Sequence, residues 1–204
     1  LIRLRGTLSH DIRAPNLTEL FNRGTALQNA AIDPNLGVQV PIFQTTSGNP
    51  NLKPEVANTL TGGIVLSPAS GLNISLDYYR IKLKNAIYTV GQNTVLQRCN
   101  DGEAAFCEQV SFNAPGGVLS EIRIYPRNLS AQEVSGIDFQ ADWRVPLFAG
   151  TLSSRLTASY TLTQTQTALG KTFDYNGAIG SESPVQGFPK LRGTLSETYQ
   201  QGPT

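Results

Sequence analysis

The sequence predicts an all-β fold of about seven long antiparallel strands, and three observations support this prediction. Apolar and polar residues alternate over long stretches, helical periodicity is almost absent, and the connections between strands are either short or very long. The clearest alternation lies in residues 150–163, where only Ser154 interrupts the apolar row. The apolar members of this row are Leu152, Leu156, Ala158, Tyr160 and Leu162.

The other expected strands repeat this pattern along the chain. In order, the strands are Ile2–Ile12, Leu60–Leu66, Leu72–Ile87, Leu119–Tyr125, Ile137–Val145, Gly150–Thr163 and Leu191–Tyr199. Each carries apolar residues at every second position, with weaker rows in the fourth and the last. The row of the third strand changes phase near Tyr78–Arg80 and continues through Ile81 and Leu83, which predicts a β-bulge.

Strand length separates two kinds of all-β protein. Strands of soluble domains usually have about five or six residues, whereas strands that cross a bilayer need about 9–11 and are tilted. An apolar row facing lipid and a Thr/Ser/Gln/Arg row facing a wet lumen is typical of an outer-membrane barrel. In the alternative, a soluble β-sandwich, β-solenoid or other all-β binding or adhesin module, the apolar rows face a core. Alternation alone does not distinguish the outer-membrane barrel from the soluble all-β module.

The connections favour the barrel. Short ones are expected at Pro68–Gly71, near Val145–Gly150 and near Ser130–Glu133, and long ones at Arg13–Pro54, Gly91–Gly117 and Ala168–Lys190. A compact soluble domain rarely carries three structureless loops of more than about 20 residues. Transmembrane barrels instead combine short periplasmic turns with long extracellular loops. The sequence therefore predicts up-and-down strands of a transmembrane β-barrel.

Composition excludes several classes of function. The 204 residues have a net charge of +1 and only 15% charged residues, so no strong field attracts nucleic acid or acidic lipid. One histidine, His10, and two cysteines cannot build a His/Cys zinc site, and no cofactor, catalytic site or metal site is expected. His10 lies on an apolar row, so we expect it to pack or to lie at an interface. The chain starts at Leu1 and has no methionine, so we expect a piece of a longer protein.

Two segments in the first long loop go beyond composition. The first contains Arg13, Ala14, Pro15, Leu17, Glu19, Leu20 and Phe21, and the second contains Gly48, Asn49, Pro50, Leu52, Lys53, Pro54 and Glu55. In both order and separation they resemble the R-A-P-x-L-x-E-L-F and G-N-P-x-L-K-P-E stretches of TonB-dependent outer-membrane receptors. Asn16 could cap one helical turn with Glu19 three residues on, and the prolines keep the second segment extended. These motifs indicate architecture and not a substrate, so the ligand-binding residues are unknown.

The resemblance implies the rest of the expected function. Such receptors are 22-stranded barrels in the outer membrane of Gram-negative bacteria, with a separate plug domain in the lumen. TonB supplies energy for import of a scarce nutrient such as a ferric siderophore, cobalamin, haem or an oligosaccharide. Residues 1–204 would then be a late part of the barrel, without plug, without TonB box and, at Gly202–Thr204, without an aromatic terminal strand. We expect no enzymatic activity. We do expect contact with outer-membrane lipid, and self-association of an isolated piece.

Smaller expectations concern particular side chains. Cys99 and Cys107 lie eight positions apart in a long loop, where an oxidising compartment favours a disulfide. The alternatives are two free thiols or an incomplete metal site, and the scarcity of histidines argues against metal. Six aromatic residues could form girdles at the membrane boundaries: Tyr78, Tyr79, Tyr88, Trp143, Tyr160 and Tyr199. Some arginines of the polar rows could pair with carboxylates of a plug: Arg5, Arg123, Arg144, Arg155 and Arg192.

Overall fold

The fold is described from a computed structural model, in which residues 1–178 and 188–201 are described. The prediction that no aromatic terminal strand is present at Gly202–Thr204 concerns residues outside the described ranges. The chain divides into two compact units. We call Leu1–Ile12, Val56–Lys84 and Ser130–Thr204 the wall, and Arg13–Glu55 with Asn85–Leu129 the loop unit. Each unit is treated by itself.

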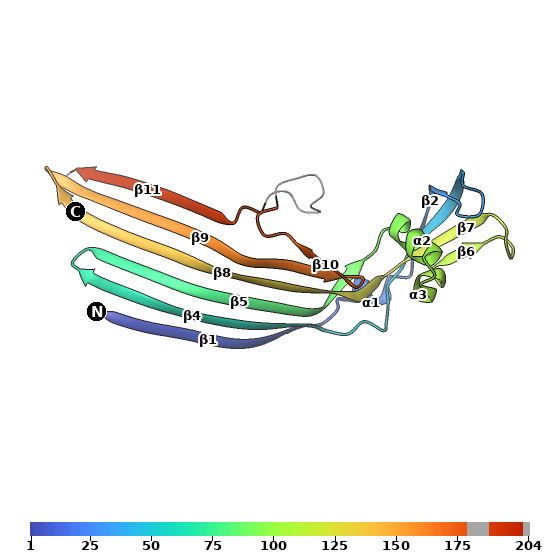
Figure 1. The fold of residues 1–204 in the computed structure, drawn as a ribbon, viewed down its shortest axis with the longest axis horizontal. Coiled ribbons are helices and arrows are strands. Elements are labelled where there is room, and N and C mark those ends of the chain that lie inside the picture. The colour runs from blue at the N-terminus through green and yellow to red at the C-terminus, as the bar shows by residue number, and fades with distance from the viewer. Residues whose placement is uncertain (179–187, 202–204) are drawn as a thin grey trace. The chain divides into compact units, whose positions relative to one another are not determined.

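The wall is one sheet of seven strands (Figure 1). Its strands are β1 (Ile2–Arg13), β4 (Glu55–Ala69), β5 (Leu72–Thr89), β8 (Pro126–Leu147), β9 (Gly150–Ala168), β10 (Lys171–Asp174) and β11 (Leu191–Gln201). The hydrogen-bonded order is β1-β4-β5-β8-β9-β10, and β11 also pairs with β9. The registers of β4 with β5 and of β9 with β8, β10 and β11 are antiparallel. The predicted all-β, antiparallel fold with long strands is confirmed, and this chain does not close a barrel.

The registers divide the wall into two chemically distinct faces. In register, Phe139 lies opposite Ala158 and Ala141 opposite Leu156, and Leu156 also lies opposite Leu195. Because side chains alternate along a strand, these apolar residues share what we call the apolar face. Thr157, opposite Gln140, lies on the other, polar face. Along β9 the apolar row runs from Leu152 to Leu162, about 33 Å of extended chain, enough for a tilted strand to cross an apolar band about 25 Å tall.

Nothing in the wall covers its apolar face. Among the described residues, every buried apolar side chain except Tyr175 belongs to the loop unit. The apolar face remains exposed along β1, β4, β5, β8, β9 and β11, for example at Leu4, Leu60, Leu76 and Leu195. Within the apolar rows Leu152–Leu162 of β9 and Leu191–Tyr199 of β11, Glu197 is the one charged residue. A soluble sandwich would bury these rows in a core, so the wall has the character of a sheet made for lipid.

Two local predictions about the wall were wrong. The expected turn at Ser130–Glu133 lies within β8, whose pairing with β9 continues from Ser130 to Leu147. The expected bulge at Tyr78–Arg80 is absent from the β4–β5 register, which shifts only between Leu66 and Ala69. The apolar residues change faces there without any break in pairing. The predicted strand at Leu119–Tyr125 does form, but it belongs to the sheet of the loop unit.

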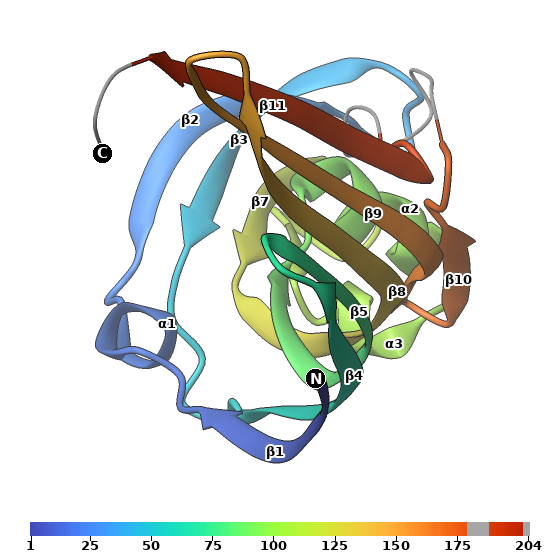
Figure 2. The same ribbon diagram turned by 90° about the vertical axis from the view of Figure 1, so that its left-hand side faces the viewer.

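The loop unit is an ordered structure, in contrast to the structureless loops that the sequence suggested. A second sheet has the order β2-β3-β7-β6 (Figure 2). The elements are α1 (Leu17–Phe21), β2 (Thr25–Ile32), β3 (Gln39–Thr46), α2 (Gln92–Asn100), α3 (Ala104–Cys107), β6 (Val110–Phe112) and β7 (Leu119–Ile124). Strands β3 and β7 pair in parallel, with Phe43 opposite Glu121. The sheet therefore joins the first long loop to the second.

A small core holds the loop unit together. Its most buried apolar side chains are Ile42, Val95, Phe106, Leu119 and Ile122, at 0–3% exposure. These residues come from β3, α2, α3 and β7, so packing as well as hydrogen bonding unites both loops. Among the described residues, none of the helices has the length and apolar composition needed to cross a membrane.

The two faces of the wall should respond in opposite ways to an inserted charge. We expect Leu156→Arg, on the apolar face, to destabilise the folded receptor in lipid vesicles by about 2–4 kcal/mol, because an arginine would enter hydrocarbon. The neighbouring Thr157→Arg, on the polar face, should cost less than about 1 kcal/mol. Denaturant titration of the vesicle-bound receptor measures both. Equal losses for both variants would show that the faces are wrongly assigned.

Candidate functional site

The first loop motif forms the capped helix α1. Asn16 Oδ1 accepts the Glu19 backbone N–H at 2.8 Å, and the Glu19 carboxylate accepts the Asn16 backbone N–H at the same distance. This reciprocal capping box is the arrangement that the spacing predicts. The N–H of Asn16 is also the main reason why the pKa of Glu19 lies below its usual range, with Arg13 adding to the effect.

The second motif packs directly against the backbone of the first. The Gly48 N–H donates to the Asn22 carbonyl at 2.9 Å, and the Asn49 N–H donates to the Glu19 carbonyl at 2.8 Å. A Cβ on Gly48 would lie 2.6 Å from the carbonyl carbon of Leu20. Glycine is therefore required here by the close approach of two backbone segments, a pairing that spacing alone did not show.

Arg13 connects both ends of the first long loop. Its Nε donates to Glu55 Oε2 at 2.6 Å, and its Nη1 lies 3.2 Å from Glu19 Oε2. Arg13 is the last residue of β1 and Glu55 the first of β4. The other Glu55 oxygen accepts the Ile87 N–H at 2.7 Å. The Glu55 carboxylate therefore joins the end of β1, the start of β4 and the last part of β5, and the charged motif residues form a junction.

Asn128 of β8 ties this junction to Asn85 of β5, and it was not predicted as a site residue. Its side chain accepts the Lys53 N–H at 2.8 Å and donates to the Lys53 carbonyl at 2.9 Å. It also donates to the carbonyl of Asn85 at 2.6 Å, and Asn85 has a positive φ of 56°. Asn49 Nδ2 donates to the Pro126 carbonyl at 2.9 Å. No local signal marks Asn128, because its partners are remote in sequence.

The apolar members of the motifs have different environments. Leu52 is buried, so the second motif also contributes to packing. Leu17 and Phe21 are exposed at 77% and 61% on α1. They lie four positions apart and hence on one side of the helix. The hydrogen bonds and ion pairs of the two motifs come from their backbone, asparagine and charged groups.

Asp33 is a second polar group that was not among the predicted site residues. Its side chain is fully buried and accepts the N–H groups of Asn35 at 2.7 Å, Leu36 at 3.2 Å and Leu119 at 2.7 Å. These bonds, led by that from Leu119, hold the pKa of Asp33 below its usual range. The Asp33-Pro34-Asn35 sequence is a turn signal, and it could have predicted the local hydrogen bonds to Asn35 and Leu36. The bond to Leu119 depends on tertiary structure.

The two cysteines staple the helical part of the loop unit. The sulfur atoms of Cys99 and Cys107 are bonded, with 4.6 Å between their Cα atoms. The bond joins the end of α2 to the end of α3. The described residues contain no group of three or more His, Cys, Asp or Glu side chains placed to hold a metal ion.

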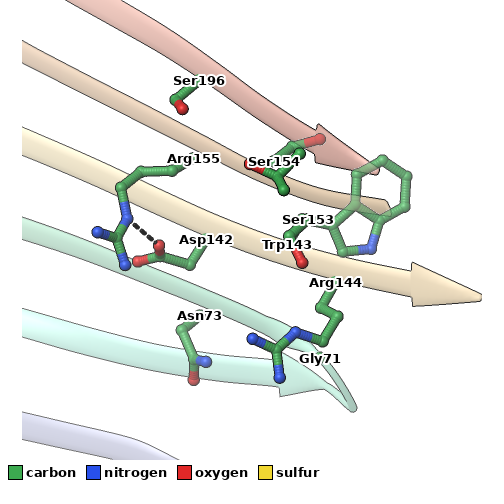
Figure 3. Close-up of a pocket in the computed structure, with 10 residues that line it drawn as sticks. Gly71, Asn73, Asp142, Trp143, Arg144, Ser153, Ser154, Arg155 and Ser196 are labelled. Atoms are coloured by element: carbon green, nitrogen blue, oxygen red, sulfur yellow. Dashed lines mark hydrogen bonds and ion pairs between the residues drawn. The ribbon is translucent and has the colours of Figure 1, made fainter. Parts of the chain in front are cut away.

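The polar face of the wall carries paired charges beside shallow grooves. Arg5 Nε donates to Asp77 at 2.6 Å, and Arg155 Nε donates to Asp142 at 2.5 Å. Figure 3 shows the second pair together with Arg144. These residues line a groove of about 550 Å³. A groove of about 690 Å³ beside Arg5 also includes Arg192. Of the arginines expected on polar rows, Arg123 alone lies in the loop unit, on β7.

Four of the six expected girdle residues lie on the apolar face. Tyr160 lies opposite both Ile137 and Leu191, and Tyr199 lies opposite Leu152. Trp143 and Tyr78 share the face by alternation with Phe139 and Leu76. Tyr79 instead belongs to the polar face, where its hydroxyl approaches Gly136, and Tyr88 lies in the loop unit. Aromatic residues thus lie near both ends of the apolar rows.

A sheet with one uncovered apolar face, one charged polar face and ordered long loops is a wall segment of a membrane β-barrel. The chain belongs to the family of TonB-dependent receptor-like β-barrels, whose model matches residues 2–204. This is a family of transport receptors and not of enzymes, found in the outer membrane of Gram-negative bacteria. No curated protein sequence matches the chain.

Solved structures show the same fold. A variant of the ferric enterobactin receptor PfeA from Pseudomonas aeruginosa, in complex with enterobactin, has a TM-score of 0.54 at 17% identity, over 98% of this chain and 31% of that chain. PfeA in complex with BCV-L6 gives 0.53 at the same identity and coverage. The siderophore receptor PirA from Acinetobacter baumannii gives 0.50 at 17% identity, over 82% of this chain and 22% of that chain. This chain therefore spans less than a third of each.

Proposed function

We propose that this chain is part of the barrel of an outer-membrane receptor that imports a scarce nutrient, with a ferric siderophore as the first substrate to test. The observation that carries the proposal is the wall itself, whose uncovered apolar face lies opposite a face of charged pairs. The family match over residues 2–204 supports a transport role. Siderophore receptors with the same fold give the first substrate class to test.

The whole receptor would supply what this chain lacks. In the proposal, residues 1–204 are one part of the barrel domain, and a plug domain lies elsewhere in the protein. TonB contacts the whole receptor and couples import to the proton gradient. Arg144 and Arg192, on the polar face, are candidates for pairing with carboxylates of the plug, since guanidinium groups bind carboxylates in bidentate fashion. The disulfide between Cys99 and Cys107 would keep the helices of the loop unit together outside the cell.

Uptake by whole cells tests this function. A strain that lacks the complete gene should lose growth on at least one ferric siderophore in iron-limited medium, and the complete gene should restore it. Uptake of the same iron-55 complex should fall to background when TonB is removed from the complemented strain. Fractionation should place the protein in the outer membrane. A protein recovered from cytoplasm or medium, or uptake that does not need TonB, would contradict the proposal.

A further inference from the structure

The phase change in β5 places a row of basic residues on the apolar face. The β4–β5 register runs unbroken from Leu66, opposite Ile74, to Val56, opposite Lys84. Arg80, Lys82 and Lys84 therefore share a face with Ile74, because side chains alternate strictly along an unbroken strand. The apolar row of β5 ends at Tyr78, and the basic row begins two residues later. The cations thus continue the lipid-facing row toward the long loops.

Polar groups from three neighbouring strands join this basic row. Glu133 of β8 accepts from Arg80 Nε at 2.8 Å and lies 3.6 Å from Lys82 Nζ. On the other side, His10 Nδ1 of β1 lies 2.8 Å from Asn58 Oδ1 of β4. The side chains of Arg80 and Lys82 remain 43% and 42% exposed. Three basic residues and one acidic residue leave this cluster with a surplus of two positive charges.

A groove on the apolar face is lined by members of the cationic cluster and by apolar side chains. It has a volume of about 490 Å³, and its lining residues are Leu8, Ser9, His10, Asn58, Thr59, Leu60, Arg80 and Lys82. Leu8 and Leu60 belong to the apolar rows and are exposed at 82% and 43%. A single ligand in this groove would therefore meet hydrocarbon at one end and cations at the other. That combination fits an amphiphile better than a soluble anion.

The position of the basic row along β5 indicates how deep these residues lie in the membrane. Tyr78 precedes the first cation, and aromatic rings of transmembrane barrels gather at the boundary between hydrocarbon and headgroups. Lys and Arg side chains near this boundary keep their charge in the headgroup layer while their stems lie along apolar surface. The basic row therefore lies at headgroup depth on the side of the long loops.

We propose that Arg80, Lys82 and Lys84 bind the phosphate of an anionic lipid in the leaflet on the loop side. The acyl chain of that lipid lies along Leu8 and Leu60, and Glu133 orients Arg80 and Lys82. The inference rests on membership of a membrane-barrel family and not on which nutrient is imported. A basic pocket at headgroup depth is the chemistry that recognises phosphorylated headgroups.

Native mass spectrometry of the full-length receptor in detergent tests the proposal. Phosphatidylglycerol and phosphatidylcholine with identical acyl chains are added separately, and bound lipid is counted. We expect phosphatidylglycerol to bind the native receptor more tightly. The double variant Lys82→Gln/Lys84→Gln, which keeps the Arg80–Glu133 pair, should bind it on the order of 10- to 30-fold more weakly.

A matched variant on the other face makes the test specific. Arg144→Gln/Arg192→Gln removes the same charge from the polar face and should leave phosphatidylglycerol binding unchanged. An equal loss in both variants, or equal binding of the two lipids, would overturn the proposal. Millimolar inorganic phosphate should compete poorly, because it lacks an acyl chain. Full competition would show a site for free anions and would also overturn it.

Discussion

Replacing Asp33 with alanine is expected to lower the free energy of unfolding of the loop unit by about 2–4 kcal/mol. The variant leaves the Leu119 N–H, which lies among buried residues, without an acceptor. A buried unpaired donor costs roughly 1–3 kcal/mol. The N–H groups of Asn35 and Leu36 belong to exposed residues, so water can partly replace the carboxylate there. The largest part of the loss therefore comes from the contact between the two loops.

Hydrogen exchange in the full-length receptor measures this effect locally. Amide protection in β3 and β7 should fall by about 30- to 1,000-fold, which corresponds to the expected free energy. Protection in the wall strands β8 and β9 should stay the same. Unchanged exchange in β7 would mean that the buried carboxylate does not hold the two loops together.

The pH dependence of this protection gives an independent check. The pKa of Asp33 is lowered in the folded state, so its contribution is fully present above the unfolded pKa of about 3.9. It is lost as pH falls through the lower folded pKa. Asp33→Asn should remove this part of the acid sensitivity below about pH 4, whereas the lowered pKa of Glu19 should maintain another part. If protection fell identically at low pH in the native and Asp33→Asn proteins, the Asp33 carboxylate would not be the group responsible.

The wall could be predicted because each of its long strands carries its own alternation of apolar and polar residues. Alternation in residues such as Leu152–Leu162 reports directly which side of a strand meets lipid, and register follows from short turns. The same logic failed at Tyr78–Arg80. There the chemical environment of each face changes along an intact strand, and a sequence alone cannot distinguish this change from an inserted residue.

Apart from the strand β7, which was predicted, the loop unit could not be predicted because its order comes from contacts between distant segments. Phe43 and Glu121 pair in parallel strands, and neither segment has a long alternating row of its own. Val95 and Phe106 lie in short helices whose apolar residues are too few for a clear period. Within the motifs, the capping box at Asn16 was predictable from spacing, whereas the contact of Gly48 with Leu20 was not.

Replacing Gly48 with alanine is expected to separate the two motifs, at a cost of about 3 kcal/mol or more. The added Cβ would lie 2.6 Å from the Leu20 carbonyl carbon and 2.7 Å from the Asn22 nitrogen. Both are backbone atoms, so no side-chain rotation relieves the overlap. The Gly48 and Asn49 hydrogen bonds to α1 and its C-cap must therefore break, and Arg13 then spans two segments that no longer touch.

The comparison with a second glycine isolates this packing effect. Gly91 lies in the same unit, and a Cβ there would meet nothing within 4 Å, so Gly91→Ala should cost less than about 1 kcal/mol even though it is an N-cap. Limited proteolysis of the full-length receptor in detergent should cut residues 13–24 at least tenfold faster in Gly48→Ala than in Gly91→Ala. Equal cleavage would show that the junction tolerates a side chain and that the glycine of the second motif is not required for contact with the first.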